Sequence, residues 1–471
     1  EPPDDGAQPQ QDARRSAVPR VSRKPRGVYV GRGGGMTAVS GKRQRAFAVW
    51  WLEMERWNPG SFVKTGWRWP KEHIKPLSTV LKAKQVAVTD RQKTLPMITI
   101  RFDGEMEMRG NSADEIKGKL YLAKAGDVVY SKIDVRNGAI GIVPDSLATV
   151  AVTSEFPVYE VKTDIALPMY VKLLFRTDFF KKIINGMISG ASGRKRVQPT
   201  QLVDIEIPLP PLSVQQAIVA HWTKAQSFVF DAEHRLVTLK QRVNDYLYSL
   251  TEMKPCERRA LALSWDELES WDVKSSRAAA FKQANPTFKP FGDFAEEATE
   301  LVRPKLESEK DWPVYGVNNK EGVFFSDYQK GADFNAPYKR IRKDWFFHNP
   351  TRSSVGSLGI VPEVPEDAIT SPEYQVWRIR KGLLTGFVAV MITTEYFIKL
   401  IQFNRVGAVK QRLYVENLLS IPIPEIPERF QHEVALEREK TLAAIAESRA
   451  KVADAAVEVE AMILGTKPVI V

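Results

Sequence analysis

Three residues in the first half of the chain have the types and spacing of a metal-dependent hydrolytic site. Asp145 follows a proline, and Glu160 and Lys162 come shortly after it in a Glu-x-Lys arrangement. In such sites the carboxylates hold Mg²⁺ and the lysine steadies the attacking water. The pattern is degenerate, because the matching stretch of the second half has Pro362-Glu363 but no Glu-x-Lys. We keep a metal-dependent DNA endonuclease as an alternative hypothesis.

Sequence motifs for other catalytic chemistries are incomplete. Asn58-Pro-Gly-Ser and Asn349-Pro-Thr-Arg lack the second proline and the aromatic residue of an adenine methyltransferase motif. No glycine-rich loop follows a predicted strand to hold S-adenosylmethionine, and no Gly-x-x-x-x-Gly-Lys-Ser/Thr loop would hold ATP. The five histidines and the single cysteine, Cys256, lack the spacing of a zinc site. The sequence therefore predicts a chain that has no catalytic residues and holds neither a metal nor a cofactor.

The composition favours a negatively charged partner. The 471 residues carry a formal net charge of +11 at pH 7, and such a surplus attracts polyanions such as nucleic acid. No stretch approaches the ~18 consecutive apolar residues of a membrane span, so no membrane contact is expected. A single cysteine excludes an internal disulfide framework and suits the reducing cytoplasm, where we expect the protein to act.

Two long segments organise the rest of the chain. In both, an apolar residue recurs at the spacing of a coiled-coil helix. In the first segment the seam residues are Ile218, Trp222, Ala225, Val229, Ala232, Leu236, Leu239, Val243, Tyr246 and Leu250. In the second they are Leu442, Ile445, Val452, Ala456, Val459 and Ile463, with Arg449 as the one polar residue. Ser213 and Gln216 predict a capping box at the start of the first helix. The two seams are expected to pair.

The two halves of the chain repeat each other. Three motifs recur 214 residues apart: Trp51-x-Glu-x-Glu-x-Trp57 as Trp265-x-Glu-x-Glu-x-Trp271, Lys75-Pro-Leu as Lys289-Pro-Phe, and Ile207-Pro-Leu-Pro as Ile421-Pro-Ile-Pro. Gly141-Ile-Val-Pro144 returns as Gly359-Ile-Val-Pro362. These ordered matches indicate a duplicated domain, because their period far exceeds the roughly 20–50 residues of stacked repeats. In each copy short β-rich runs precede a helix-like segment, which predicts a mixed α+β domain.

These motifs together resemble the specificity subunit of type I restriction–modification systems. The resemblance covers about residues 50–465 and rests on Gly126-Asp-Val-Val-Tyr-Ser-Lys132, Ser154-Glu-Phe156 and Ile207-Pro-Leu-Pro-Pro-Leu-Ser-Val-Gln-Gln216. It implies two target-recognition domains, each reading one half of a bipartite DNA site. It also implies that the two long helices pair antiparallel, space the half-sites and dock methyltransferase subunits.

The second copy departs from this pattern in two places. Glu425 and Pro427 disturb the Pro-Pro-Leu-Ser-x-Gln-Gln form, and His348-Asn-Pro-Thr replaces Ser131-Lys-Ile-Asp. These departures indicate that the second copy can have lost some of the contacts expected from the family pattern.

The predicted fold is α+β. It has two tandem mixed α/β target-recognition domains separated by two long helices that form an antiparallel coiled coil, and hence an internal pseudo-two-fold repeat. The predicted segments are a disordered leader (1–35), recognition domain 1 (36–212), spacer helix 1 (213–252), recognition domain 2 (253–424), spacer helix 2 (425–465) and a tail (466–471).

Loops that recur in both halves supply the DNA-binding candidates. Lysine and arginine are expected on phosphates, whereas asparagine, glutamine, serine and arginine can reach base edges. The predicted DNA-binding residues are Lys132, Arg136, Asn137, Arg194, Lys195, Arg196, Asn349, Arg352, Ser353, Ser354, Arg405, Lys410, Gln411 and Arg412.

The resemblance also implies the partners and their cofactors. Besides double-stranded DNA, the partners are two methyltransferase subunits, which bind S-adenosylmethionine and flip out a target adenine. Restriction and translocase subunits would use ATP and Mg²⁺, and none of these cofactors is expected on this chain. A coiled-coil scaffold without DNA binding is a further alternative. It explains the helices but neither the positive charge nor the paired basic loops.

Overall fold

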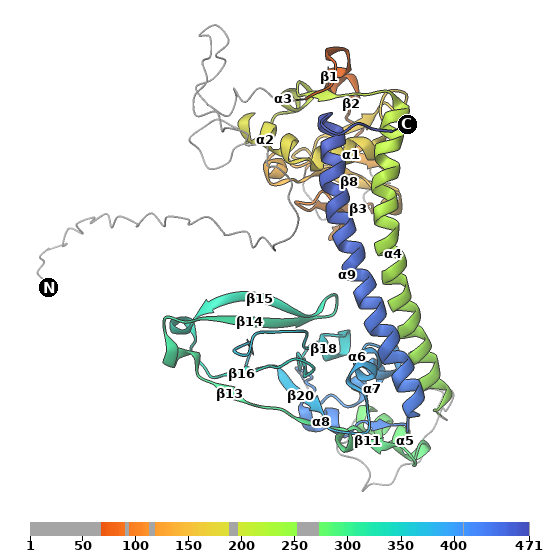
Figure 1. Ribbon diagram of the computed structural model, residues 1–471, viewed down its shortest axis with the longest axis vertical. Helices are drawn as coiled ribbons and strands as arrows, with labels where there is room; N and C mark the ends of the chain where they lie inside the picture. Colours follow the sequence, from red (N-terminus) through yellow and green to blue (C-terminus); the bar gives the residue numbers. More distant parts are fainter. Residues whose placement is uncertain are drawn as a thin grey trace, which may run out of the picture. The chain divides into compact units, whose positions relative to one another are not determined.

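The computed structural model describes residues 67–89, 94–112, 118–187, 196–251, 273–407 and 409–470 (Figure 1). All of these residues belong to one compact unit, which comprises residues 58–471. The predicted leader and both copies of the Trp-x-Glu-x-Glu-x-Trp motif lie outside the described residues.

Two long helices, α4 (Leu212–Ser249) and α9 (Glu428–Leu464), run side by side in opposite directions (Figure 1). Arg242 near the end of α4 pairs with Glu437 near the start of α9 at 2.8 Å. Glu233, farther back in α4, pairs with Arg449, farther along α9, at 2.9 Å. From the first ion pair to the second, the residue number falls along α4 and rises along α9. The two helices are therefore antiparallel, and the predicted coiled coil is confirmed.

The start of α4 differs from the prediction. The helix begins at Leu212 after Pro211, and no side chain caps it, so the capping box of Ser213 and Gln216 is wrong. Proline supplies the boundary instead, because its fixed φ suits the residues just before a helix and it has no N–H to leave unpaired.

The seam of α9 also differs from the prediction. Arg449 and Ala456 are exposed and Leu442 is 38% exposed, so these three predicted seam residues are wrong. The buried residues of this stretch are Thr441, Ile445, Ser448, Ala455, Val459, Met462 and Ile463. The Glu233–Arg449 pair sets Ser448 near the level of Ala232 of α4, and both of these small side chains are buried. Apolar periodicity alone pointed to Leu442, which is larger but faces outward.

The first domain contains two sheets. One has the order β2-β9-β6-β7, and the other has the order β4-β3-β8-β5. The strands are β2 (Leu81–Lys84), β3 (Pro96–Ile100), β4 (Met106–Ser112), β5 (Leu120–Lys124), β6 (Val128–Tyr130), β7 (Ile140–Ile142), β8 (Thr149–Thr153) and β9 (Val158–Val161). Most pairs are antiparallel, but β3 and β8 are parallel.

The second domain repeats this topology and adds one strand, β13, at the edge of its second sheet. Its sheets have the orders β12-β20-β17-β18 and β13-β16-β19-β14-β15, and β14 is parallel to β19 just as β3 is to β8. The strands are β12 (Ala295–Glu297), β13 (Leu301–Val302), β14 (Asp311–Asn318), β15 (Gly322–Lys330), β16 (Tyr338–Arg340), β17 (Phe346–His348), β18 (Leu358–Ile360), β19 (Ile369–Thr370) and β20 (Gln375–Ile379). The duplicated α+β domain predicted from the repeats is therefore confirmed.

Each domain is completed by short helices and by a small pair of strands. The helices are α1 (Pro168–Arg176), α2 (Asp178–Met187) and α3 (Pro199–Val203) in the first domain, and α5 (Val273–Ala284), α6 (Thr385–Met391), α7 (Glu395–Phe403) and α8 (Val415–Leu419) in the second. The antiparallel strand pairs are β1 (Ile74–Pro76) with β10 (Glu206–Pro208), and β11 (Lys289–Pro290) with β21 (Pro422–Ile423). The proline-rich repeats thus form the strands that precede α4 and α9.

The two domain cores lie at opposite ends of the helix pair. The first core includes Ile218 from the start of α4 and Val459 from the end of α9. The second includes Val243 from the end of α4 and Val434 from the start of α9. Because each core buries residues of both long helices, each domain is packed directly onto the helix pair.

A buried glutamine fastens each domain to the first turn of a long helix. The amide oxygen of Gln215 accepts from the backbone N–H of Leu167 at 3.0 Å, and its Nε2 donates to the carbonyl oxygen of Pro210 at 2.8 Å. In the second copy Gln431 accepts from Leu384 at 2.8 Å and donates to Ile426 at 2.9 Å. The second copy therefore keeps this contact despite its altered sequence.

We expect Gln215→Ala to lower the free energy of unfolding by about 2 kcal/mol, since it leaves buried backbone groups unpaired. Gln216→Ala is the matched control, because the Gln216 side chain is exposed. Urea denaturation of the full chain would measure both. Equal midpoints for the two variants would contradict the role given to Gln215.

Among the described residues, no single helix has the length and apolar character needed to cross a membrane. One helix pair, α6 with α7, passes that test only when taken together, and it is bent by 75°.

Candidate nucleic-acid interface

The same loop follows the central strand of both domains. After β6, the Ser131 hydroxyl accepts from the backbone N–H of Asp134 at 3.1 Å; after β17, the Asn349 side-chain oxygen accepts from the backbone N–H of Arg352 at 3.3 Å. Each of these bonds lies at the start of a short 3-10 turn, Asp134–Asn137 or Ser353–Val355. Ser131 therefore corresponds to Asn349, and matching Ser131 with His348 was wrong by one residue. The second loop keeps the geometry of the first.

His348 has a structural counterpart in the first domain, Tyr130. The Tyr130 hydroxyl donates to the carbonyl oxygen of Val197 at 3.2 Å, and His348 Nε2 lies 3.0 Å from the carbonyl oxygen of Leu413. Trp377 Nε1 donates to His348 Nδ1 at 3.3 Å, so the Nε2 atom carries the proton. Complete burial lowers the pKa of His348 to about 4. This neutral histidine ties β17 to the segment that follows α7.

In the first domain, two predicted residues converge on the turn after β8. Lys132 Nζ donates to the carbonyl oxygen of Ser154 at 2.7 Å, and Arg196 lies 3.2 Å from a carboxylate oxygen of Glu155. Arg136 is half-buried and Asn137 is exposed on the neighbouring 3-10 turn. Arg194 and Lys195 lie outside the described residues.

In the second domain, several predicted residues bind one another. Arg405 donates to the Ser354 hydroxyl at 2.7 Å and to the carbonyl oxygen of Gln411 at 2.9 Å. Burial lowers the pKa of Arg405, and the two hydrogen bonds connect the loop after β17 to the turn after α7. Ser353 is fully buried and donates to Pro350, so its side chain does not reach the surface.

The remaining candidates of the second domain are more accessible. Arg352 and Lys410 are exposed, and Gln411 is half-buried. Arg412 lies 3.8 Å from a carboxylate oxygen of Glu373, at the limit of an ion pair. Arg352 and Lys410 are therefore the candidates best placed for phosphate contacts.

Arg176, at the end of α1, positions the first-domain loop and was not among the candidates. It donates to the carbonyl oxygens of Phe102 at 3.2 Å, of Gly138 at 3.0 Å, and of Ile140. Burial lowers the pKa of its guanidinium group, and nearby Asp103 opposes that shift. The repeat gave no signal for this residue, because the corresponding position of the second copy is Thr393.

The geometry does not favour the nuclease alternative. Asp145 lies in the turn after β7, whereas Glu160 lies in β9, and β6 separates the two strands. Two strand spacings correspond to about 10 Å, and both carboxylates are exposed. Within the described ranges, no group of three histidine, cysteine, aspartate or glutamate side chains could hold a metal ion.

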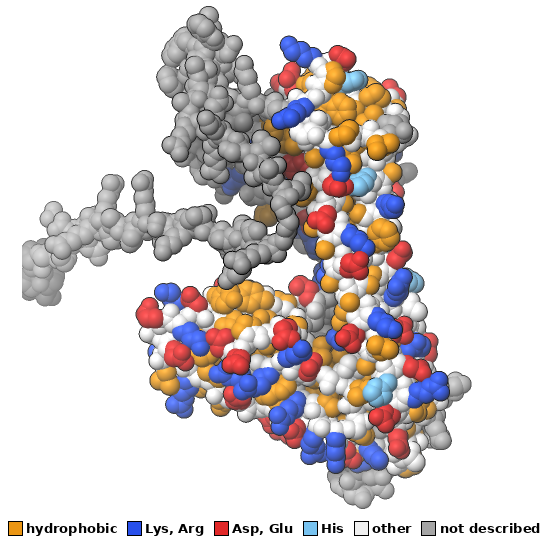
Figure 2. Space-filling view, in the orientation of Figure 1, with side chains coloured by type: hydrophobic (Ala, Val, Ile, Leu, Met, Phe, Trp, Pro, Cys, Tyr) orange, Lys and Arg blue, Asp and Glu red, His pale blue; other side chains and the backbone are white. Residues whose placement is uncertain are grey.

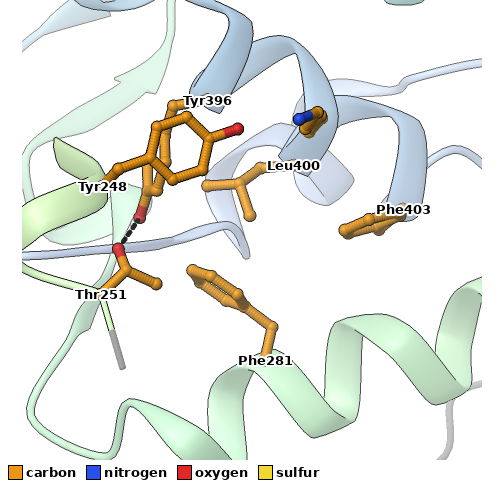
Figure 3. Close-up of a pocket in the computed structure, with 7 residues that line it drawn as sticks. Tyr248, Thr251, Phe281, Tyr396, Leu400 and Phe403 are labelled. Atoms are coloured by element: carbon orange, nitrogen blue, oxygen red, sulfur yellow. Dashed lines mark hydrogen bonds between the residues drawn. The ribbon is translucent and has the colours of Figure 1, made fainter. Parts of the chain in front are cut away.

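An apolar pocket lies where the end of α4 meets α5 and α7 (Figure 3). Tyr248, Phe281 and Leu400 line it, and Thr251 donates to the Tyr396 hydroxyl at 3.2 Å. Its volume of about 20 Å³ is close to that of one water molecule. The pocket is a packing gap between the helix pair and the second domain.

Lysine and arginine side chains alternate with acidic ones over the face shown in Figure 2. Because interspersed opposite charges weaken each other's electrostatic potential, this face has no extended positive surface. Phosphate contacts on it would therefore come from individual loops.

The fold defines a class of protein with two α/β domains of one topology on an antiparallel helix pair. Residues 80–229 match the model of the family described as "Type I restriction modification DNA specificity domain". This range begins just after a 3-10 turn, Leu77–Thr79, that precedes β2, and it ends within α4. The resemblance inferred from the sequence is thus confirmed.

Two relatives from Escherichia coli are similar to the chain. The "Type I restriction enzyme EcoAI specificity subunit" is 27% identical over 260 residues, which cover 49% of this chain and 43% of that protein. The "Type I restriction enzyme EcoEI specificity subunit" is 25% identical over 219 residues, covering 44% and 36%. The matches therefore span less than half of either relative.

One solved structure resembles the chain over most of its length. The "Type-I restriction-modification system S subunit from M. genitalium" is 10% identical, with a TM-score of 0.40, and the match covers 84% of this chain and 96% of that one.

Proposed function

We propose that this chain is the DNA sequence-recognition subunit of a type I restriction–modification complex, with each domain reading one half of a bipartite site. The observation that carries the proposal is the placement of two domains of one topology at opposite ends of an antiparallel helix pair. The 38 residues of α4 form a rod of about 57 Å. Half-sites one helical turn apart are separated by about 34–36 Å, which lies within that length. A flexible linker would sample many separations instead.

In this proposal the chain recognises DNA and its partners carry out the chemistry. Two methyltransferase subunits would bind S-adenosylmethionine and methylate an adenine, and restriction subunits would use ATP and Mg²⁺. The helix pair offers a surface for docking them, since Phe230 is 69% exposed, Val237 is 62% exposed and Val457 is 70% exposed. Contiguous exposed apolar side chains mark protein–protein contacts, and Phe230 and Val237 are one heptad apart on the same face of α4.

The predicted domain limits, 36–212 and 253–424, are part of the proposal. Residues 36–66 and 252–272 lie outside the described residues, so neither domain's first residue has been located.

A salt titration of duplex binding tests the DNA-binding role. We expect affinity to fall steeply with salt, because each phosphate contact releases counterions. Arg352→Ala should reduce the logarithmic salt slope by about one and weaken binding to all sequences alike. Lys240→Ala, which removes an exposed charge from α4, is the matched control and should leave the slope unchanged. No binding at low salt would instead favour the coiled-coil scaffold.

A further inference from the structure

In both domains a hairpin turn lies against the loop that follows the central strand. In the second domain, a Cβ atom built on Gly356, just after the Ser353–Val355 turn, would lie 3.5 Å from the Cβ of Asn319. In the first domain, one built on Gly138 would lie 2.1 Å from the carbonyl oxygen of Phe102. The turn between β3 and β4 and the turn between β14 and β15 thus occupy the same place. Each candidate loop is one half of a two-loop surface.

The β14–β15 turn holds its tip residues in a defined position. The Asn318 side-chain oxygen accepts from the backbone N–H groups of Lys320 at 2.8 Å and Glu321 at 2.7 Å. Asn319 and Lys320 are exposed between these bonded groups. Beside them, Val355 is 60% exposed. The exposed Asn319 amide therefore lies beside Gly356, in the loop that also carries the exposed side chains of Val355 and Arg352.

We propose that Asn319 is a specificity-determining residue of the second domain and that it reads an adenine in the major groove. The inference rests on the proposed function, since it names the base contact of that DNA-recognition site. An asparagine amide offers one donor and one acceptor, which match N7 and the N6 amino group of adenine. Val355 supplies apolar contact of the kind that suits a thymine methyl group. Asn318 holds the turn and leaves the Asn319 amide free to face the DNA.

The corresponding turn of the first domain has different chemistry. Phe102, which is 60% exposed, takes the place of Asn319, and Asp103 takes the place of Lys320. A carboxylate can accept from the cytosine N4 amino group but cannot pair with both groups of adenine. The two half-sites should therefore differ in sequence, although the domains share one topology.

The test is selection of bound sequences from a pool of randomised duplexes by the full chain. The wild-type chain should enrich a bipartite site with an adenine at one position of one half-site. Asn319→Ala should reduce the preference for that adenine about tenfold and leave the other half-site unchanged. Asn319→Asp should shift the preference at the same position to cytosine. Asn335→Ala is the control, because Asn335 is exposed beyond the opposite end of the same hairpin.

The outcomes separate the inference from the function on which it rests. An unchanged adenine preference in Asn319→Ala would overturn the inference and leave the proposed function standing. A uniform loss of binding to all sequences would assign Asn319 to folding or phosphate contact and would also overturn it. Absence of any enriched site with the wild-type chain would overturn both.

Discussion

Seven residues inserted at matching levels of α4 and α9 are expected to lengthen the preferred gap between the half-sites by about three base pairs. At ~1.5 Å per residue the insertion adds about 10 Å, and base pairs stack ~3.4 Å apart. The Glu233–Arg449 pair marks one matching level in the two helices. A full heptad keeps the buried seams facing each other, so the half-sites themselves should stay the same.

Selection of bound duplexes with variable gaps would measure this shift. The control carries the seven residues in α4 alone, where α9 has no added turns to pair with them. That variant should lose stability without acquiring a longer gap, because both ends of α4 are packed against residues of α9. A stable double insertion that still preferred the original gap would refute the role of the helix pair as a spacer.

The second prediction concerns pH and His348. Its pKa falls from 6.5 in the unfolded chain to about 4 in the folded one, so the unfolded state binds the extra proton between these values. The stability that comes from burying the neutral ring is fully present above pH 6.5 and is lost as the pH falls towards 4. From pH 7 to pH 5 we expect a loss of about 2 kcal/mol from this group.

His348→Gln isolates the contribution, because glutamine can donate and accept hydrogen bonds but does not titrate. The wild-type chain should lose about 2 kcal/mol more than the variant over this pH range, as measured by urea denaturation at both pH values. If the free energies of unfolding of the two proteins changed equally with pH, protonation of His348 would not destabilise the folded chain, and the prediction would be wrong.

The repeats were enough to predict the duplication. Motifs such as Ile207-Pro-Leu-Pro and Ile421-Pro-Ile-Pro recur in order, and they form strands before the long helices in both copies. The spacing of apolar residues also located both helices, because apolar residues that recur at intervals of three and four lie on one face of a helix. These features are local, and local patterns are readable from one chain.

Side-chain roles were less readable. From the sequence we predicted that Arg405, Ser354 and Arg352 all contact DNA. In the folded chain Arg405 donates a hydrogen bond to Ser354, whereas Arg352 is exposed. Charge and residue type do not distinguish an arginine that faces solvent from one that connects two loops. Only the packing of α7 against the loop after β17 decides between these roles.

By itself, the sequence determined the two-domain organisation, the two long helices and the family resemblance, because these depend on periodicity and on motifs that occur twice. The tertiary structure decided the register of the α9 seam, the place of Arg176 and the pairing of each candidate loop with a hairpin turn. Those features depend on contacts between residues far apart in the chain, such as Arg176 with Phe102 and Asn319 with Gly356. No local pattern encodes such contacts, since they exist only when the sheets have formed and packed.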